Sequence, residues 1–227
     1  MGRRITRKQL KQDEFVSTVD TVIHWGAGYW RPIVAGLAVV CAIVLVWWLG
    51  SRWSASRAGQ ASYLLYQAVS AYEDQVASGV VPAEGDTAES KLREVVERHG
   101  RSDQADAARV YLAKLHIERG ETEIARGLLV EVIGRHSDDA LGRLATLDLI
   151  HLRADSGEYA EVAQELEAMV AGSDRRLPRD TALYELGELF VAQRDPDRAR
   201  QYFQKLVDEF PTSPFTSRAR QRLGELG

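Results

Sequence analysis

Apolar side chains recur at a fixed interval along most of the chain. Four stretches, starting at Thr87, Glu123, Tyr159 and Pro196, show the same order of a smaller residue followed by large apolar ones. Aligned at a spacing of 37 residues, the positions are Ala88, Ala125, Val162 and Ala199, then Leu92, Leu129, Leu166 and Phe203, then Val95, Val132, Met169 and Leu206. Steps of four and three residues place these side chains on one face of a helix. The pattern therefore predicts one amphipathic helix in each of four units.

Turn residues recur with the same period. Gly120 and Gly157 lie 37 residues apart, and Arg194 takes that place in the last unit, ahead of Asp195 and Pro196. Asp followed by Pro is typical of a helix N-cap and first turn. A unit of two helices cannot bury its apolar face alone, whereas stacked units can. We therefore expect residues 54–227 to form an all-α solenoid of about four helix-turn-helix units.

Two further helices complete this expected domain. The segment Gln60–Val76 should supply the partner helix of the first unit, with Leu64, Leu65, Ala68, Tyr72 and Val76 on its inner face. A loop over about residues 78–86, rich in Gly and Pro, should follow it. At the other end, Ser213 and Pro214 are expected to open a terminal capping helix with a polar outer face.

A different pattern precedes the repeats. Residues 33–49 form a run of 17 residues without charge, and a helix from Trp30 to Trp48 would span about 27 Å, close to the hydrocarbon thickness of a bilayer. Aromatic side chains bracket the run, as they do at the two faces of a membrane. These candidate interface residues are Trp25, Tyr29, Trp30, Trp47, Trp48 and Trp53. The pattern predicts a transmembrane helix over residues 32–53.

Three alternatives compete with a membrane anchor. The run could be a buried helix, a signal peptide cleaved near residues 54–56, or a lipoprotein signal at Cys41. The aromatic flanks argue against the first, and the 31-residue lead argues against the second. Val40 stands where a lipoprotein signal needs a small residue.

Charge gives the predicted anchor a direction. Residues 1–31 carry six basic and three acidic side chains, whereas the whole chain has a net charge of −4, so the remainder is acidic. Positive residues before the run predict a cytoplasmic N-terminus and place residues 54–227 on the periplasmic side. Residues 1–31 form either a short amphipathic helix on the membrane surface or a solvated tail. This distribution suggests a single-pass membrane protein and not a nucleic-acid binder.

The last unit resembles a tetratricopeptide repeat. Leu183, Leu186, Gly187 and Phe190 on its first helix, and Ala199, Phe203, Leu206 and Pro211 afterwards, follow that family's order of small and large residues. The middle units depart from it, because Arg109 and Thr146 stand where a large apolar residue is expected. The whole layout is similar to the ancillary subunit of the bacterial Sec translocon (the YfgM type). That resemblance implies a location in the bacterial inner membrane, and a role in protein export with translocon subunits and a periplasmic chaperone as partners.

No catalytic motif is present. The chain lacks a phosphate-binding loop, a nucleophile elbow and a zinc-protease motif, and its five histidines are scattered. We therefore expect no enzymatic activity, no cofactor, no metal site and no small-molecule substrate. His99 and His136 recur because the repeat recurs, which is not the spacing of metal ligands.

Two surfaces remain as candidates for binding. Tetratricopeptide domains line a groove with the first helix of each unit, and transferring that register points to Val110, Lys114, Tyr184 and Glu188. On the predicted anchor, Ala35, Ala38 and Ala42 share a face that either packs against another membrane helix or faces lipid. The leading hypothesis is an export adaptor that binds through its repeats. The alternative is a single-helix structural subunit of another membrane complex.

Overall fold

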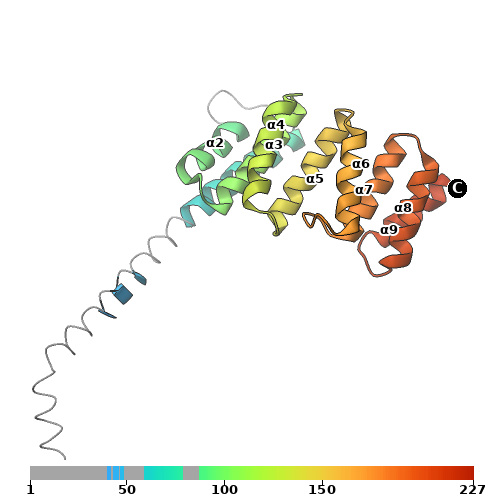
Figure 1. The fold of residues 1–227 in the computed structure, drawn as a ribbon. Coiled ribbons are helices and arrows are strands. Elements are labelled where there is room, and N and C mark those ends of the chain that lie inside the picture. Colours follow the sequence, from blue (N-terminus) through green and yellow to red (C-terminus); the bar gives the residue numbers. More distant parts are fainter. Residues whose placement is uncertain (1–39, 42, 46, 49–58, 79–86) are drawn as a thin grey trace, which may run out of the picture. The chain divides into compact units, whose positions relative to one another are not determined.

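The computed structural model describes residues 40, 41, 43–45, 47, 48, 59–78 and 87–227. The chain divides into two units, Met1–Arg57 and Ala58–Gly227. In the part that is described, every regular element is a helix (Figure 1). Most of the predicted anchor lies outside the described residues. So do the candidate positions Trp25, Tyr29, Trp30, Trp53, Ala35, Ala38 and Ala42.

Within the first unit, the described residues between 40 and 48 are helical and their apolar side chains are exposed. They include Val40, Ile43, Val44, Leu45, Trp47 and Trp48. Among the described residues, no helix has the length and hydropathy needed to cross a bilayer.

The second unit is a series of helix pairs (Figure 1). The helix over residues 59–78 packs with α2 (Ala88–His99), and α3 (Asp103–Glu118) packs with α4 (Thr122–Arg135). The pairs continue with α5 (Ala140–Asp155) and α6 (Tyr159–Ala171), then α7 (Arg179–Ala192) and α8 (Pro196–Glu209). The last helix, α9 (Thr216–Leu226), packs against α8 and ends the series. We call 59–78, α3, α5 and α7 first helices, and α2, α4, α6 and α8 second helices.

The predicted apolar rows form the core. All twelve aligned positions on α2, α4, α6 and α8 have no exposed surface. They distribute over three clusters, and each cluster draws side chains from at least three helices. Helix α5 takes part in two of them, through Leu149 in one and Ile150 in the other. Neighbouring repeats therefore share their cores, and the 37-residue pattern is confirmed.

The first helix confirms most of its predicted inner face. Ala68 is buried, and Leu64, Leu65 and Tyr72 pack against the first cluster. Val76 is the exception, because it is 56% exposed. The last turns of this helix have few buried neighbours, and Glu73, Asp74, Ala77 and Ser78 are exposed as well.

The capping helix is present but begins later than predicted. Helix α9 starts at Thr216, whereas the sequence pointed to Ser213 as its N-cap. The Ser213 hydroxyl instead donates to Asp180 Oδ2 at 2.7 Å and accepts from the Phe215 N–H at 3.2 Å. Ser213 thus joins the loop to α7, and its side chain is not free to cap α9. Asp195, in contrast, caps α8 as predicted and accepts from the Arg198 N–H.

The three turn positions that recur with the repeat share one backbone conformation. Gly120, Gly157 and Arg194 have φ angles of 75°, 87° and 60°, in the left-handed region. Glycine reaches this region without steric cost, whereas a residue with a Cβ is strained there. The last repeat therefore carries strain that the two before it avoid.

Gly157→Ala is expected to lower the free energy of unfolding by about 1 kcal/mol, because alanine is disfavoured at positive φ. The matched control is Gly127→Ala, at an exposed position inside α4 where an added Cβ meets nothing within 4 Å. That change should raise stability by about 0.5–1 kcal/mol. Urea denaturation measures both, and equal shifts in the two variants would contradict the interpretation.

One repeat has a distinctive fit between its two helices. A Cβ added to Gly187 on α7 would lie 2.3 Å from Cε1 of the Phe203 ring on α8. The equivalent positions in the second repeat hold Ala113 and Leu129, both buried in one cluster. The larger ring in the last repeat is thus accommodated by the smaller residue opposite.

We expect Gly187→Ala to destabilise the protein by about 1–3 kcal/mol through overpacking. Adding Phe203→Leu should recover part of this loss, because it recreates the alanine and leucine of the second repeat. A double-mutant cycle by denaturation measures the coupling. Strictly additive effects would show that the ring and the glycine do not constrain each other.

Candidate functional site

One face of the first helices, together with the equivalent face of α9, reaches the surface in a regular array. On each helix the outward positions recur at each helical turn, and corresponding positions on successive helices are 37 residues apart. We call this surface the first-helix face. Its half-buried or exposed members are Tyr111, Lys114 and Glu118 on α3, Leu144, Leu147, Asp148, His151 and Asp155 on α5, Tyr184, Glu185 and Glu188 on α7, and Arg222 and Glu225 on α9.

Three of the four predicted groove residues lie on this face. Lys114 and Glu188 occupy equivalent positions on α3 and α7, with His151 between them on α5. Tyr184 is half-buried. The structure corrects the prediction for Val110, which is 2% exposed and packs in the core cluster of α3, α4 and α5. Val110 shares its register position with Tyr184 two repeats later, so the register is the same and Val110 differs because it is covered by core residues of α4 and α5.

Ion pairs cross this face from each helix to the next. Lys114 Nζ lies 3.8 Å from Asp148 Oδ2, His151 Nε2 lies 2.9 Å from Glu185 Oε2, and Arg222 Nη2 lies 2.7 Å from Glu188 Oε2. The two residues of each pair are 34 residues apart in the sequence. This is the repeat length of 37 residues minus three, so each partner lies about one helical turn before the equivalent position on the next helix of this face. The sequence carries this signal as opposite charges 34 residues apart, and reasoning from apolar period alone missed it.

A family model of the tetratricopeptide repeat-like domain matches residues 24–226. The chain belongs to this tetratricopeptide repeat-like family. A similar solved structure is the crystal structure of a tetratricopeptide repeat protein from Parabacteroides merdae ATCC 43184 at 2.39 Å resolution. It shares 16% identity with this chain, has a TM-score of 0.49, and the match covers 72% of this chain and 60% of that one. No curated protein matches the sequence.

Tetratricopeptide repeats are typical protein-interaction domains. In this domain, aromatic packing holds one side chain of the first-helix face, Tyr184, in place. The Tyr184 ring stacks on Phe215 with centroids 5.0 Å apart and lies 5.8 Å from Phe203. Burial and the nearby Glu188 carboxylate raise the pKa of Tyr184. Tyr184 thus anchors the α9 cap as well as contributing to the face.

The centre of the face favours positive charge. The hydrogen bond to Glu185 raises the pKa of His151, and the charges of Glu185, Asp148 and Asp155 act in the same direction. Burial raises the pKa of Asp148, whose Oδ2 atom is buried without a hydrogen-bond partner. Lys114 is too distant, at 3.8 Å, to donate a hydrogen bond to it.

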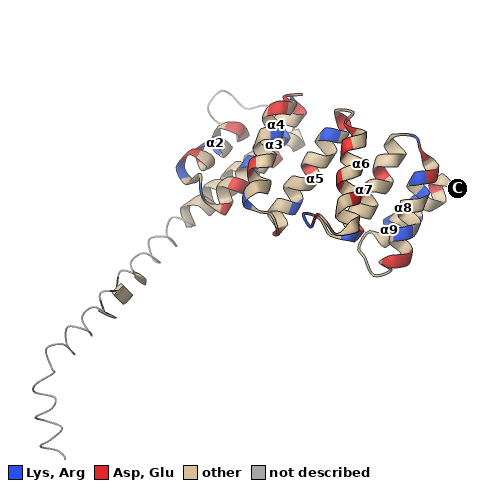
Figure 2. Cartoon of the chain, viewed as in Figure 1, with Lys and Arg blue, Asp and Glu red and all other residues tan. Residues whose placement is uncertain are grey.

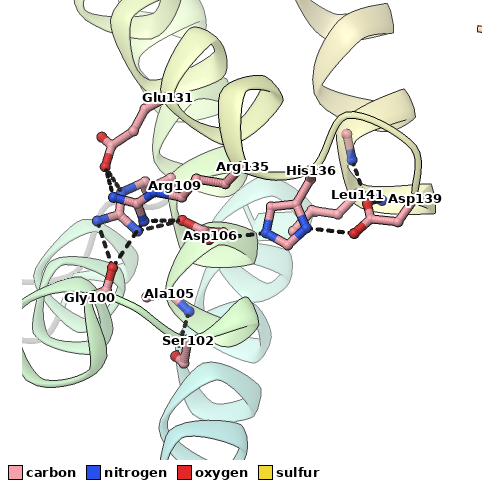
Figure 3. A network of polar contacts seen from close by, with 11 residues as sticks. Gly100, Ser102, Ala105, Asp106, Arg109, Glu131, Arg135, His136, Asp139 and Leu141 are labelled. Atoms are coloured by element: carbon pink, nitrogen blue, oxygen red, sulfur yellow. Dashed lines mark hydrogen bonds and ion pairs between the residues drawn. The ribbon is translucent and has the colours of Figure 1, made fainter. Parts of the chain in front are cut away.

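A second group of charged side chains lies inside the tetratricopeptide domain and has a structural role (Figure 3). Asp106 on α3 is 3% exposed and accepts from Arg109 Nη1 at 2.7 Å and from Arg135 Nη1 at 2.8 Å. Its other oxygen lies 3.0 Å from His136 Nε2. Both arginines also donate to the Gly100 carbonyl at the end of α2.

This charged group, with Asp106 and Arg109 buried at its centre, joins three successive repeats. Arg109 and Arg135 share the Glu131 carboxylate, and His136 Nδ1 lies 2.6 Å from Asp139, the N-cap of α5. Arg109, unexpected in a core position, is thus paired with Asp106 three residues earlier. Among the described residues, no cluster of His, Cys, Asp and Glu is arranged to hold a metal ion.

His136 makes stability depend on pH. Its hydrogen bond to Asp139 raises its pKa most, and the bond to Asp106 adds to this effect. Both ring nitrogens face carboxylates, so the doubly protonated ring satisfies both contacts. A raised folded-state pKa contributes stability below the ordinary value near 6.5, and this contribution is lost as pH rises through the folded value.

We therefore expect the stability gap between the native protein and His136→Asn to be largest near pH 6 and to shrink towards pH 9. Urea denaturation across this pH range measures the gap. His99→Asn, at the equivalent position one repeat earlier, is the control. A gap that widens with rising pH would contradict the assigned charge state.

Proposed function

We propose that this protein is a non-enzymatic docking module, held in a bacterial inner membrane by its N-terminal helix, that assists protein export. The observation that carries the proposal is the first-helix face. It is a repeated, solvent-accessible surface in a family of protein-interaction repeats. Translocon subunits and a periplasmic chaperone are the proposed partners.

The membrane anchor is supported by three features of the N-terminal part. Residues 33–49 are uncharged, aromatic residues bracket them, and basic residues precede them. Side chains such as Ile43, Leu45 and Trp47 are exposed on helical backbone, as lipid-facing side chains would be. The separation of Met1–Arg57 from Ala58–Gly227 fits an anchor distinct from a docking domain.

The export role is supported by the order of the parts. A short basic tail, one apolar segment and a tetratricopeptide-like domain follow one another here, as in the ancillary translocon subunits that the chain resembles. A chemical role has no comparable support, since Asp106 and Arg109, which are both buried, pair with each other.

Affinity purification of the full-length protein from its native membrane in mild detergent, followed by mass spectrometry, tests this function. We expect translocon subunits and a periplasmic chaperone. Leu144→Arg on the first-helix face should reduce their recovery, whereas Ala35→Leu, Ala38→Leu and Ala42→Leu in the anchor should leave it unchanged.

The opposite result would overturn the proposal. Recovery of a different stoichiometric membrane complex that is lost in the anchor variants and kept in Leu144→Arg would assign the protein to that complex as a single-helix structural subunit.

A further inference from the structure

We propose that the first-helix face of α3, α5 and α7 binds a partner segment in which Lys or Arg side chains alternate with apolar ones. This inference rests on the proposed docking function and names the chemistry of the partner. It concerns a segment of another protein.

The charges of the face are the first argument. On α3, α5 and α7 its carboxylates are Glu118, Asp148, Asp155, Glu185 and Glu188, against one lysine, Lys114. Charged residues occur on every helix from α2 to α9 (Figure 2), but the face as defined above includes no Lys or Arg from α5 or α7. A positively charged segment is complementary to such a surface, and an acidic one is repelled by it.

The contacts within the face leave part of this charge uncompensated. Arg222 on α9 donates two hydrogen bonds to the Glu188 carboxylate and so neutralises its charge. Asp148, in contrast, has only Lys114 at 3.8 Å, and its buried Oδ2 accepts no hydrogen bond. A carboxylate that is shielded from water and lacks a hydrogen-bonded cation is stabilised most when a positive charge comes close to it.

His151 shows that a positive charge is favoured at this place. Its ring bonds to Glu185, with Asp148 and Asp155 on its own helix close enough to influence its charge. The His151 side chain is 59% exposed, so its contact with Glu185 lies at the surface, where an approaching ammonium or guanidinium group can compete for the same carboxylate. Arg and Lys suit such sites because they bring charge and hydrogen-bond donors together.

The face also exposes apolar surface, which a partner segment carrying only charged side chains would leave uncovered. Leu144 is 41% exposed at the middle of the array. Its equivalents on the neighbouring helices are short, Ala107 on α3 and Thr181 on α7. Leu147, three residues further along α5, and its equivalent Tyr184 on α7 are partly buried and pack against the core. A partner that covered Leu144 with an apolar side chain would remove this surface from water.

The probe is a pair of synthetic peptides of equal length, one built from Leu, Ala and Lys and the other with Glu replacing every Lys. Binding to the full-length protein in detergent is measured by fluorescence anisotropy. The Lys peptide should bind, more weakly at higher salt, and the Glu peptide should not. Equal binding of both peptides, or binding of neither, would overturn the inference.

Matched variants test whether the face is responsible. Asp155→Asn with Glu185→Gln should weaken Lys-peptide binding about fivefold, as expected for two partly exposed charge contacts. Glu123→Gln with Glu161→Gln removes two exposed carboxylates from α4 and α6 and should leave binding unchanged. Equal losses in the two double variants would show that net charge, and not this face, attracts the peptide.

One further result separates this inference from the proposed function. If export partners copurify but the Lys peptide does not bind, the docking function stands and the basic partner is wrong.

Discussion

Burial of apolar side chains between neighbouring repeats is the interaction on which the rest of the structure depends. The three aligned rows of α2, α4, α6 and α8 have no exposed surface, and every cluster they join includes helices of more than one pair. A single pair would expose much of this surface to water, so each repeat is stable only with its neighbour in place. The spacing of 37 residues persists because a shift in one repeat would displace its rows from those of the next.

Polar groups take over where apolar packing is incomplete. Arg109 and Thr146 stand at a position that Leu183 fills in the last repeat. Thr146 donates its hydroxyl to the Gly142 carbonyl one turn earlier, and Arg109 pairs with Asp106, Glu131 and the Gly100 carbonyl. A buried charge is tolerated only when its partners are fixed, and here they come from the ends of α2, α3 and α4. The group therefore binds the first repeats together at the place where their sequence departs most from the family.

The sequence predicted those parts of the fold that depend on period and turn chemistry. Rows such as Leu92, Leu129, Leu166 and Phe203 were identified because burial repeats with the helix. The turns at Gly120 and Gly157 were located because glycine recurs, and the structure adds that both are left-handed. Val76 and the start of α9 were wrong for a common reason. Their structure depends on neighbours that local pattern does not contain, such as Asp180 bonding to Ser213.

The candidate site was harder to predict, and the error at Val110 shows why. Val110 and Tyr184 share one register position two repeats apart, yet Val110 is buried against α4 and α5 whereas Tyr184 is half-buried. Exposure at one register position therefore varies from repeat to repeat with the residues packed around it. Lys114 and Glu188 were placed on the surface by the same transfer, but their partners Asp148 and Arg222 required the relation between successive first helices.

The division between core and face explains how such a domain acquires a specific surface. The second helices supply most of the rows that hold neighbouring repeats together, and those rows stay apolar in every repeat. The outward positions of the first helices are not required to stay apolar, because they are not buried between repeats. Position 111 and its equivalents hold Tyr, Asp, Glu and Arg in turn, and position 114 and its equivalents hold Lys, His, Glu and Glu. Because the fold fixes where these side chains lie and leaves their chemistry free, the acidic centre on α5 and α7 is a property of this chain. Under the proposed docking function, partner choice therefore depends on those residues and not on the repeat architecture that carries them.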